Sequence, residues 1–346
     1  MTIPQQGLNH NGSDAMATTS FTVSVVIEWY NVTHAEISRA KRMLAAVKSQ
    51  AAILYSKDTT ASIRLSLPLE LVIAFNSAKL DGAKVRGIVD DVIGVSEWLT
   101  LRYMPVAGAT YCKLKNAGAS IATGDIIIFL DSDLKPEPEW LAAFLSAFSN
   151  PSVSVAVGNT YVDWSGGDAY SKSLALTWMF PLRDPGGGLT ISHWFYANNV
   201  AFRRETFLSR QFPDVPGLIH LPAKLLVERL QSDGVVIWHI GDARASHPAP
   251  NGLVHFVERA VSAGRARAFA AAESVTIDLV FRWVQCDIGS VSFGCKKILL
   301  YGSEVELRWW QVPVAITIAA TYYALLLTGS LLSVVAPRLM RNRFQL

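Results

Sequence analysis

Short apolar runs alternate with helically spaced segments through the first half of the chain. Apolar runs rich in β-branched residues predict buried strands, and apolar residues recurring every three to four positions predict amphipathic helices. The predicted strands are residues 21–27, 69–75, 99–106, 125–130 and 153–164. The predicted helices are residues 33–54 and 111–123, and a further helix is predicted to begin at Pro136. Apolar strands between amphipathic helices indicate an α/β fold with a mostly parallel sheet covered on both faces.

The pattern changes near the C-terminus, where residues 309–337 carry no charged side chain. Roughly 20 such residues suffice to span a bilayer, so this segment predicts membrane association. With one span and a cytosolic domain, the arginines of the tail 338–346 would lie outside, against the positive-inside tendency. The topology therefore stays open: the segment spans the membrane, re-enters it or lies in the interface, or residues 275–301 also engage the membrane.

The region before that segment also has helical spacing, at residues 251–272, with basic side chains at Arg259, Arg265 and Arg267. Such a helix either lies on an anionic membrane surface or packs on the domain with a solvated face. The patterns divide the chain into a disordered tail (1–20), an α/β domain (21–250), a helical region (251–308), a hydrophobic segment (309–337) and a basic tail (338–346).

Composition agrees with a membrane contribution. The chain is 51% hydrophobic and 17% charged, below the roughly 25% charged residues of soluble domains. A net charge of +3 without a basic stripe excludes nucleic acid as a partner. The three cysteines form no CxxC pair and have no zinc-ligand spacing. The polar N-terminus is not a signal peptide, which predicts a cytosolic domain.

Two aspartates, Asp131 and Asp133, directly follow the apolar run 126–130. In α/β sheets, ligands bind beyond the carboxyl ends of the strands, where these carboxylates are expected. Carboxylates at alternate positions suit Mg²⁺ or Mn²⁺ together with the oxygens of a diphosphate. The metal would also stabilise a departing nucleoside diphosphate as a Lewis acid. The spacing alone is equally compatible with a turn, because Asp and Ser favour strand-to-loop junctions.

Four segments in order resemble the glycosyltransferase family 2 enzymes. They are SVVIEWYN (24–31), KNAGASIATGDIIIFLDSDLKPEPEWL (115–141), ANNVAFRRETF (197–207) and ERLQSDGVVIWHIGDARASH (228–247). The resemblance covers about residues 21–250. It implies a GT-A fold (a Rossmann-like sheet flanked by helices), a nucleoside-diphosphate-sugar donor and a divalent cation, Mn²⁺ or Mg²⁺.

The same resemblance assigns roles residue by residue. It implies donor-binding roles for Glu28, Tyr30, Asn76, Lys115 and Asp131, acceptor-side roles for Asn198 and Asn199, and metal contacts for Asp133, Asp131 and His247. Four of these residues have an alternative: a loop histidine for His247, a solvated helix face for Lys115 and turn formation for the two asparagines.

The sequence departs from the family at two places. Residues 74–77 read AFNS where the family has an acidic pair, so Asn76 would hydrogen-bond the base with a different pattern. Residues 221–224 read LPAK where the family places its acidic general base, upstream of an Arg-Leu pair. The nearest candidates are Asp214, His220 and Glu228, of which we assign the catalytic role to His220 and Asp214. Either the base has moved, or the acceptor is unusually acidic, or donors are bound without efficient turnover.

These observations predict a membrane-associated, inverting glycosyltransferase with its catalytic domain in the cytosol. It would move a sugar from a nucleoside diphosphate to a lipid-linked or polysaccharide acceptor. One alternative is a catalytically impaired homologue that acts as a membrane scaffold. The other is a nucleotidyltransferase, which a Gly-rich phosphate loop near the N-terminus would favour; the GGG at 186–188 comes too late in the chain.

Overall fold

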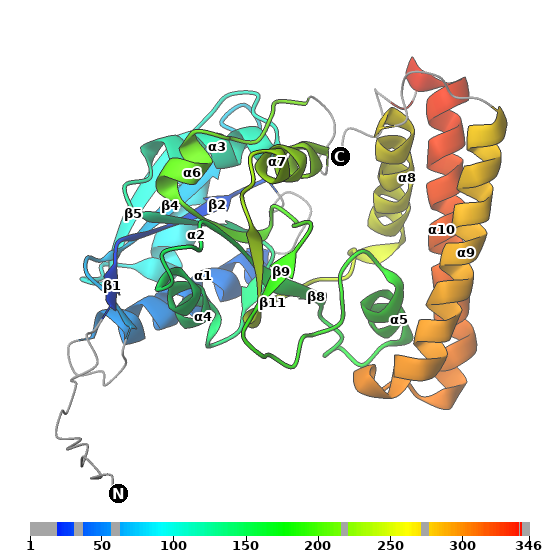
Figure 1. The fold of residues 1–346 in the computed structure, drawn as a ribbon, viewed down its shortest axis with the longest axis horizontal. Coiled ribbons are helices and arrows are strands. Elements are labelled where there is room, and N and C mark those ends of the chain that lie inside the picture. The colour runs from blue at the N-terminus through cyan, green and yellow to red at the C-terminus, as the bar shows by residue number, and fades with distance from the viewer. Residues whose placement is uncertain are drawn as a thin grey trace, which may run out of the picture.

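The computed structural model describes residues 19–30, 37–56, 63–215, 221–270, 277–338 and 340. Most of the predicted tail 1–20, most of the basic tail 338–346, and His220 lie outside these residues. Within them, a central sheet carries helices on both faces, and a group of long helices stands beside it (Figure 1). The predicted α/β fold, a sheet flanked by helices, is confirmed.

The central sheet has nine strands, eight of them in the order β5-β4-β2-β6-β10-β8-β11-β7, with β9 pairing with β11. One half is parallel, as predicted: β2 (Val23–Glu28), β4 (Leu69–Phe75), β5 (Leu99–Pro105) and β6 (Ile126–Asp131). The other half is mixed: β7 (Lys135–Pro136), β8 (Val155–Val162), β9 (Leu189–Ser192), β10 (Asn199–Arg203) and β11 (Ile237–His247). Strand β10 runs antiparallel to both its neighbours, β6 and β8. A separate parallel pair joins β1 (Thr19–Phe21) to β3 (Ile63–Leu65).

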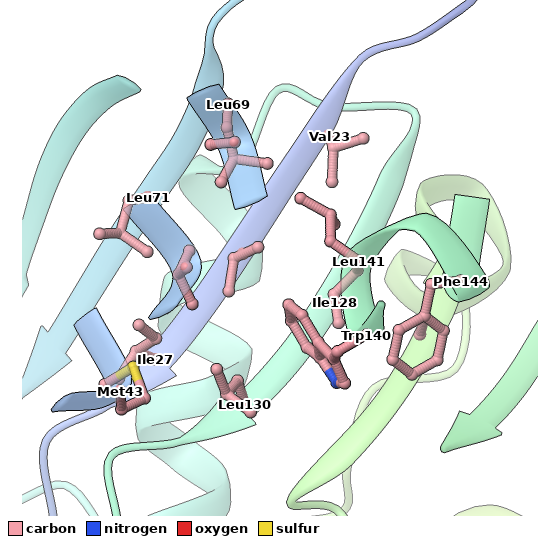
Figure 2. Close-up of a cluster of buried hydrophobic side chains, with 14 of the residues drawn as sticks. Val23, Ile27, Met43, Leu69, Leu71, Ile128, Leu130, Trp140, Leu141 and Phe144 are labelled. Atoms are coloured by element: carbon pink, nitrogen blue, oxygen red, sulfur yellow. The ribbon is translucent and has the colours of Figure 1, made fainter. Parts of the chain in front are cut away.

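Helices cover both faces of the sheet because alternate strand residues point to opposite sides. One face packs on α1 (Ile37–Tyr55), α2 (Gly82–Ile93) and α4 (Trp140–Phe148). On that face, Ile27 of β2 shares a buried cluster with Met43 of α1 and Trp140 of α4 (Figure 2). The opposite face, which includes Val26, packs on α3 (Tyr111–Ile121), α6 (Arg204–Leu208) and α7 (Leu221–Ser232).

The helix predicted to begin at Pro136 begins instead at Trp140, so that prediction is wrong at its start. Residues 135–136 form β7, an edge strand that pairs with Ala245 and Ser246 of β11. A proline is tolerated there because an edge strand leaves one side of the backbone unpaired. A proline followed by acidic residues is compatible with both a helix start and an edge strand, so this sequence signal does not distinguish the two.

A salt-bridge cluster next to β7 gives a pH-dependent prediction. Burial would raise the pKa of Glu137, but hydrogen bonds from Arg183, Arg244 and Tyr161 outweigh burial and lower the pKa to about 2. A lowered folded-state pKa contributes stability above the ordinary value of 4.5, and this is lost as pH falls toward about 2. We expect Glu137→Gln to cost about 2 kcal/mol at pH 7 and much less at pH 3. Thermal melts at both pH values measure this, and an equal loss at both would contradict it.

The last helices form a unit of their own beside the sheet (Figure 1). It contains α8 (Gly252–Ala270), α9 (Ile277–Tyr301) and α10 (Val312–Val335), joined through the short η2 (Gly302–Val305) and η3 (Trp309–Gln311). Helix α5 (Ala169–Thr177) of the sheet domain packs against α10, where the Ser173 hydroxyl donates to the Ala315 carbonyl at 2.7 Å.

Residues Trp309–Val335, 27 in all, are long and apolar enough to cross a membrane by length and composition, and only 22% of their most apolar window is buried. No other described helix passes that test. A helix of this length that hides little of its surface is consistent with the predicted membrane association.

Glycines bring α8 and α10 into backbone contact. A Cβ added at Gly329 would lie 2.2 Å from the Val261 carbonyl oxygen, and one at Gly264 would lie 2.0 Å from that of Leu326. We expect Gly329→Ala to lower the stability of the full chain by about 2 kcal/mol because the helices must move apart. Gly289→Ala is the matched control, since its Cβ meets open space, and it should be neutral or stabilising. Melts of both variants in detergent test this; equal effects would contradict it.

Candidate active site

Three carboxylates lie at the carboxyl edge of the parallel strands. Glu28 ends β2 and Asp131 ends β6, and the two residues are register partners in adjacent strands. Asp133 follows two residues later. All three side chains are almost completely buried, at 0%, 4% and 5% exposed respectively. Because like charges this close repel each other, the site needs positive charge to remain folded.

Part of that charge comes from Lys115 on α3. Its Nζ donates to Asp131 Oδ1 at 2.7 Å, and the side chain is completely buried. The Tyr111 hydroxyl also contacts both Asp131 oxygens, at 2.8 and 2.9 Å. Burial raises the pKa of Glu28, and the charge of Asp131 raises it further. The Tyr30 backbone N–H donates to Glu28 Oε2 at 2.6 Å. Burial and the charge of Asp131 outweigh this hydrogen bond and the charge of Lys115, so the pKa of Glu28 stays well above its ordinary value.

His247, at the end of β11, faces Asp133. Its Nδ1 lies 2.6 Å from the Pro248 carbonyl oxygen, which can only accept, so Nδ1 carries the hydrogen. Burial lowers the pKa of His247 to about 3, so the ring is neutral at pH 7. The lone pair of Nε2 therefore points toward Asp133 Oδ2 at 3.7 Å. Two acceptors facing each other are stabilised by a cation between them.

The residues fit a divalent cation only with help from a ligand. Among the described residues, no group of three or more His, Cys, Asp or Glu side chains could hold a metal ion. Asp133 and His247 offer two donor atoms, and the buried Ser132 hydroxyl has no hydrogen-bond partner in the described structure. Mg²⁺ and Mn²⁺ sites of this kind complete their coordination with substrate phosphates and water. Asp133 and His247 would hold the ion, which would offset the charge of a diphosphate.

Aromatic side chains connect His247 to the helical unit. The rings of Trp178 and Phe180 contact the imidazole, with centroids 5.5 and 4.9 Å away. The indole N–H of Trp178 lies 3.1 Å from the Tyr322 hydroxyl of α10. The hydrophobic segment is thus in contact with a wall of the candidate site.

A cavity of about 460 Å³ opens beside Asp131 and His247. Its walls come from both parts of the chain: Lys224 and Glu228 from α7, and Arg259 from α8. The rest of its lining is largely aromatic and includes Phe180, His193, Trp194, Phe195 and Tyr196. The cavity is large enough for a substrate group held against apolar walls.

The two predicted acceptor-side asparagines point in different directions. Asn198 lines the cavity, and its Oδ1 accepts from Thr160 at 3.3 Å. Asn199 is fully buried, accepts from the Trp140 indole at 2.8 Å and donates to the Ala243 carbonyl at 3.1 Å. Successive residues of a strand alternate between faces, so only Asn198 lies where the predicted role requires.

Asn76 and Asp214 have partners within the protein. The Asn76 amide donates to the Ala109 carbonyl and accepts from the N–H groups of Ala78 and Gly108, at 3.0–3.1 Å. Asp214 pairs with Lys113 at 2.9 Å, is half exposed and is not among the residues that line the cavity. Roles in base recognition for Asn76 and in catalysis for Asp214 and His220 stay predictions.

Sequence reasoning gave less weight to Glu228, and it left the helix of Arg259 either on a membrane surface or packed on the domain with a solvated face. Glu228 lies on the cavity rim, 54% exposed, 3.7 Å from Lys224. Arg259 lines the same cavity, and its Nε is buried. The helical spacing of α7 and α8 is visible in the sequence, but the direction in which each helix returns to the sheet is not.

Comparisons with known proteins point to one family. Residues 110–208 match the family model described as Glycosyl transferase family 2. This segment is similar to a family 2 glycosyltransferase domain, and the match spans less than a third of the chain. The matched segment includes Lys115, both aspartates and both asparagines. A curated relative, the glucosyl-dolichyl phosphate glucuronosyltransferase of Haloferax volcanii, is 29% identical over 147 residues. That alignment covers 41% of this chain and 44% of the relative, so less than half of the relative's length is spanned.

Two solved structures are also similar. One is the mannosyltransferase PcManGT from Pyrobaculum calidifontis in complex with GDP-Man and Mn²⁺, at 15% identity and a TM-score of 0.47. It covers 95% of this chain and 85% of that protein. The other is GalNAc-T7 with UDP, GalNAc and Mn²⁺, at 16% identity and a TM-score of 0.46, covering 67% of this chain and 44% of that protein.

Proposed function

We propose that this family 2 glycosyltransferase moves a sugar from a nucleoside-diphosphate donor to a lipid-linked acceptor at the cytosolic membrane face. The observation that carries the proposal is the shared cavity, which has Asp131 and His247 on one side and α8 of the helical unit on the other. Helix α8 packs along α10, the helix of membrane-crossing length. An acceptor that enters from the membrane would reach the aspartates through this cavity. A polysaccharide acceptor is the alternative, but it would not require the cavity to adjoin a helix of membrane-crossing length.

The donor side would be organised by the edge of the sheet. Asp133 and His247 would hold Mn²⁺ or Mg²⁺ on the diphosphate, and Lys115 would keep Asp131 in place. Tyr30 lies in the loop after β2, where a nucleotide base can pack against its ring. We further propose that transfer inverts the anomeric carbon, which a single displacement by the acceptor requires. The named acceptor of the Haloferax volcanii relative, a glucosyl-dolichyl phosphate, supports the lipid-linked class.

The test uses the full chain in detergent micelles with Mn²⁺, labelled UDP-glucose, UDP-N-acetylglucosamine or GDP-mannose, and polyprenyl lipids. We expect label to enter the lipid phase with release of an equal amount of nucleoside diphosphate, and the anomeric configuration of the product to be opposite to that of the donor. Release of pyrophosphate would identify a nucleotidyltransferase. Donor binding with no transfer to any lipid or glycan would identify a scaffold.

A further inference from the structure

Arg259 belongs to the helical unit, but its positive charge lies at the candidate active site. It lies on α8, yet it lines the cavity together with Asp131 and His247. Its Nε is buried and has no hydrogen-bond partner among the described residues. Its positive charge acts to lower the pKa of both Tyr30 and His247. A buried guanidinium N–H without a partner is costly, so this position favours an anionic ligand.

The carboxylates that line the cavity do not serve as that anion. Asp131 is held by Lys115 and Tyr111. Glu228 is half exposed on the rim and lies 3.7 Å from Lys224 of its own helix. The walls around Arg259 are apolar on the other side, where Met179, Phe180, Phe195 and Tyr196 contribute. Two cationic side chains, Arg259 and Lys224, among largely apolar walls fit a ligand with an anionic head and an apolar body.

A phosphate would also account for the missing general base. The segment upstream of Arg229-Leu230 has no carboxylate at residues 221–224, so a sugar hydroxyl would lack the expected proton acceptor. A phosphate monoester has a second pKa near 6, so its oxygen is already ionised at pH 7. It therefore attacks without any base.

Building on the proposed function, we propose that the acceptor is a lipid phosphate monoester and that Arg259 binds its phosphate. A non-bridging phosphate oxygen forms a bond to the anomeric carbon of the sugar. The bond from that carbon to the nucleoside diphosphate breaks, and the diphosphate leaves with the electron pair. No proton is transferred. The products are a glycosyl phosphate lipid, which is a phosphodiester, and the free nucleoside diphosphate.

The experiment compares three acceptors with the full chain in detergent: a polyprenyl phosphate, the matching polyprenol and a glucosyl polyprenyl phosphate. The variants are Arg259→Met, Arg259→Lys and, as a matched control, Arg229→Met, whose side chain is exposed on α7. We expect transfer to the monoester only. Arg259→Met should raise the KM for polyprenyl phosphate about 30-fold and leave the Kd for the nucleoside diphosphate within about 3-fold. Arg259→Lys should recover part of the loss, and Arg229→Met should match the wild type.

Each contrary result has a distinct meaning. Transfer to the glucosyl lipid or to the polyprenol, but not to the monoester, overturns the proposal and leaves the proposed function standing. A weaker Kd for the nucleoside diphosphate in Arg259→Met, with an unchanged KM for the acceptor, overturns it by making Arg259 a donor contact. An Arg259→Met variant that behaves like Arg229→Met overturns it as well. Transfer to none of the three lipids overturns both.

Discussion

Replacing Asp133 with asparagine is expected to reduce sugar transfer by about 1,000-fold or more, because the metal loses its carboxylate ligand. The change keeps the side-chain shape and removes one negative charge from a buried group that already contains Glu28 and Asp131. We therefore expect the melting temperature without metal to be unchanged or higher. Activity assays and melts on the same preparations measure both effects.

Measuring activity and stability together distinguishes a role of Asp133 in the active site from a role in forming a turn. If Asp133 only formed a turn after β6, Asp133→Asn would leave the activity intact, because asparagine forms the same turns as aspartate. Glu97→Gln is the control for loss of a carboxylate, since that residue is exposed before β5 and away from the cavity. It should change neither activity nor stability by a measurable amount.

The second large effect is on folding: Lys115→Met is expected to lower the stability by about 3–5 kcal/mol. Lys115 is completely buried and its Nζ lies 2.7 Å from Asp131. Without it, Asp131 and Glu28 stay buried side by side and lose the cation that lowers the pKa of Glu28. Chemical denaturation at pH 7 measures the loss.

Two further variants test the cause. Lys113→Met, on the same helix, removes an exposed lysine that pairs with Asp214 at 2.9 Å, and it should cost less than about 0.5 kcal/mol. Adding Asp131→Asn to Lys115→Met should recover much of the stability, because the uncompensated charge disappears. A double variant no more stable than Lys115→Met would show that packing, not charge, is responsible.

Local patterns in the sequence predicted the parallel half of the fold well. Strand β4 spans the predicted residues 69–75, and β5 and β6 differ from their predictions by one residue at one or both ends. These strands are apolar throughout because both faces of the sheet are covered. In the mixed half, β8 lies within the predicted strand 153–164. The mixed pairing was not predicted, since the position of β10 between β6 and β8 joins residues far apart in the sequence.

The part of the candidate site that lies at strand ends was predictable from the sequence. Asp131 and Asp133 follow an apolar strand, so their place at the carboxyl edge follows from the α/β pattern. The separation of Asn198 from Asn199 depends on strand alternation, which needs the start of β10 to be known. The entry of Arg259 depends on the path of α8 after β11. The spacing of residues in the sequence does not indicate the path of that helix.

The account depends most on one claim, that Asp133 and a divalent cation together bind a nucleoside diphosphate. Calorimetry on the full chain in detergent tests it directly, with UDP, GDP and dTDP, with and without Mn²⁺, for the wild type and Asp133→Asn. We predict that one of these nucleotides binds the wild type only when Mn²⁺ is present, and that Asp133→Asn abolishes this binding. A folded wild-type protein that binds none of them, or that binds equally well without Mn²⁺ or with asparagine at this position, would contradict the account.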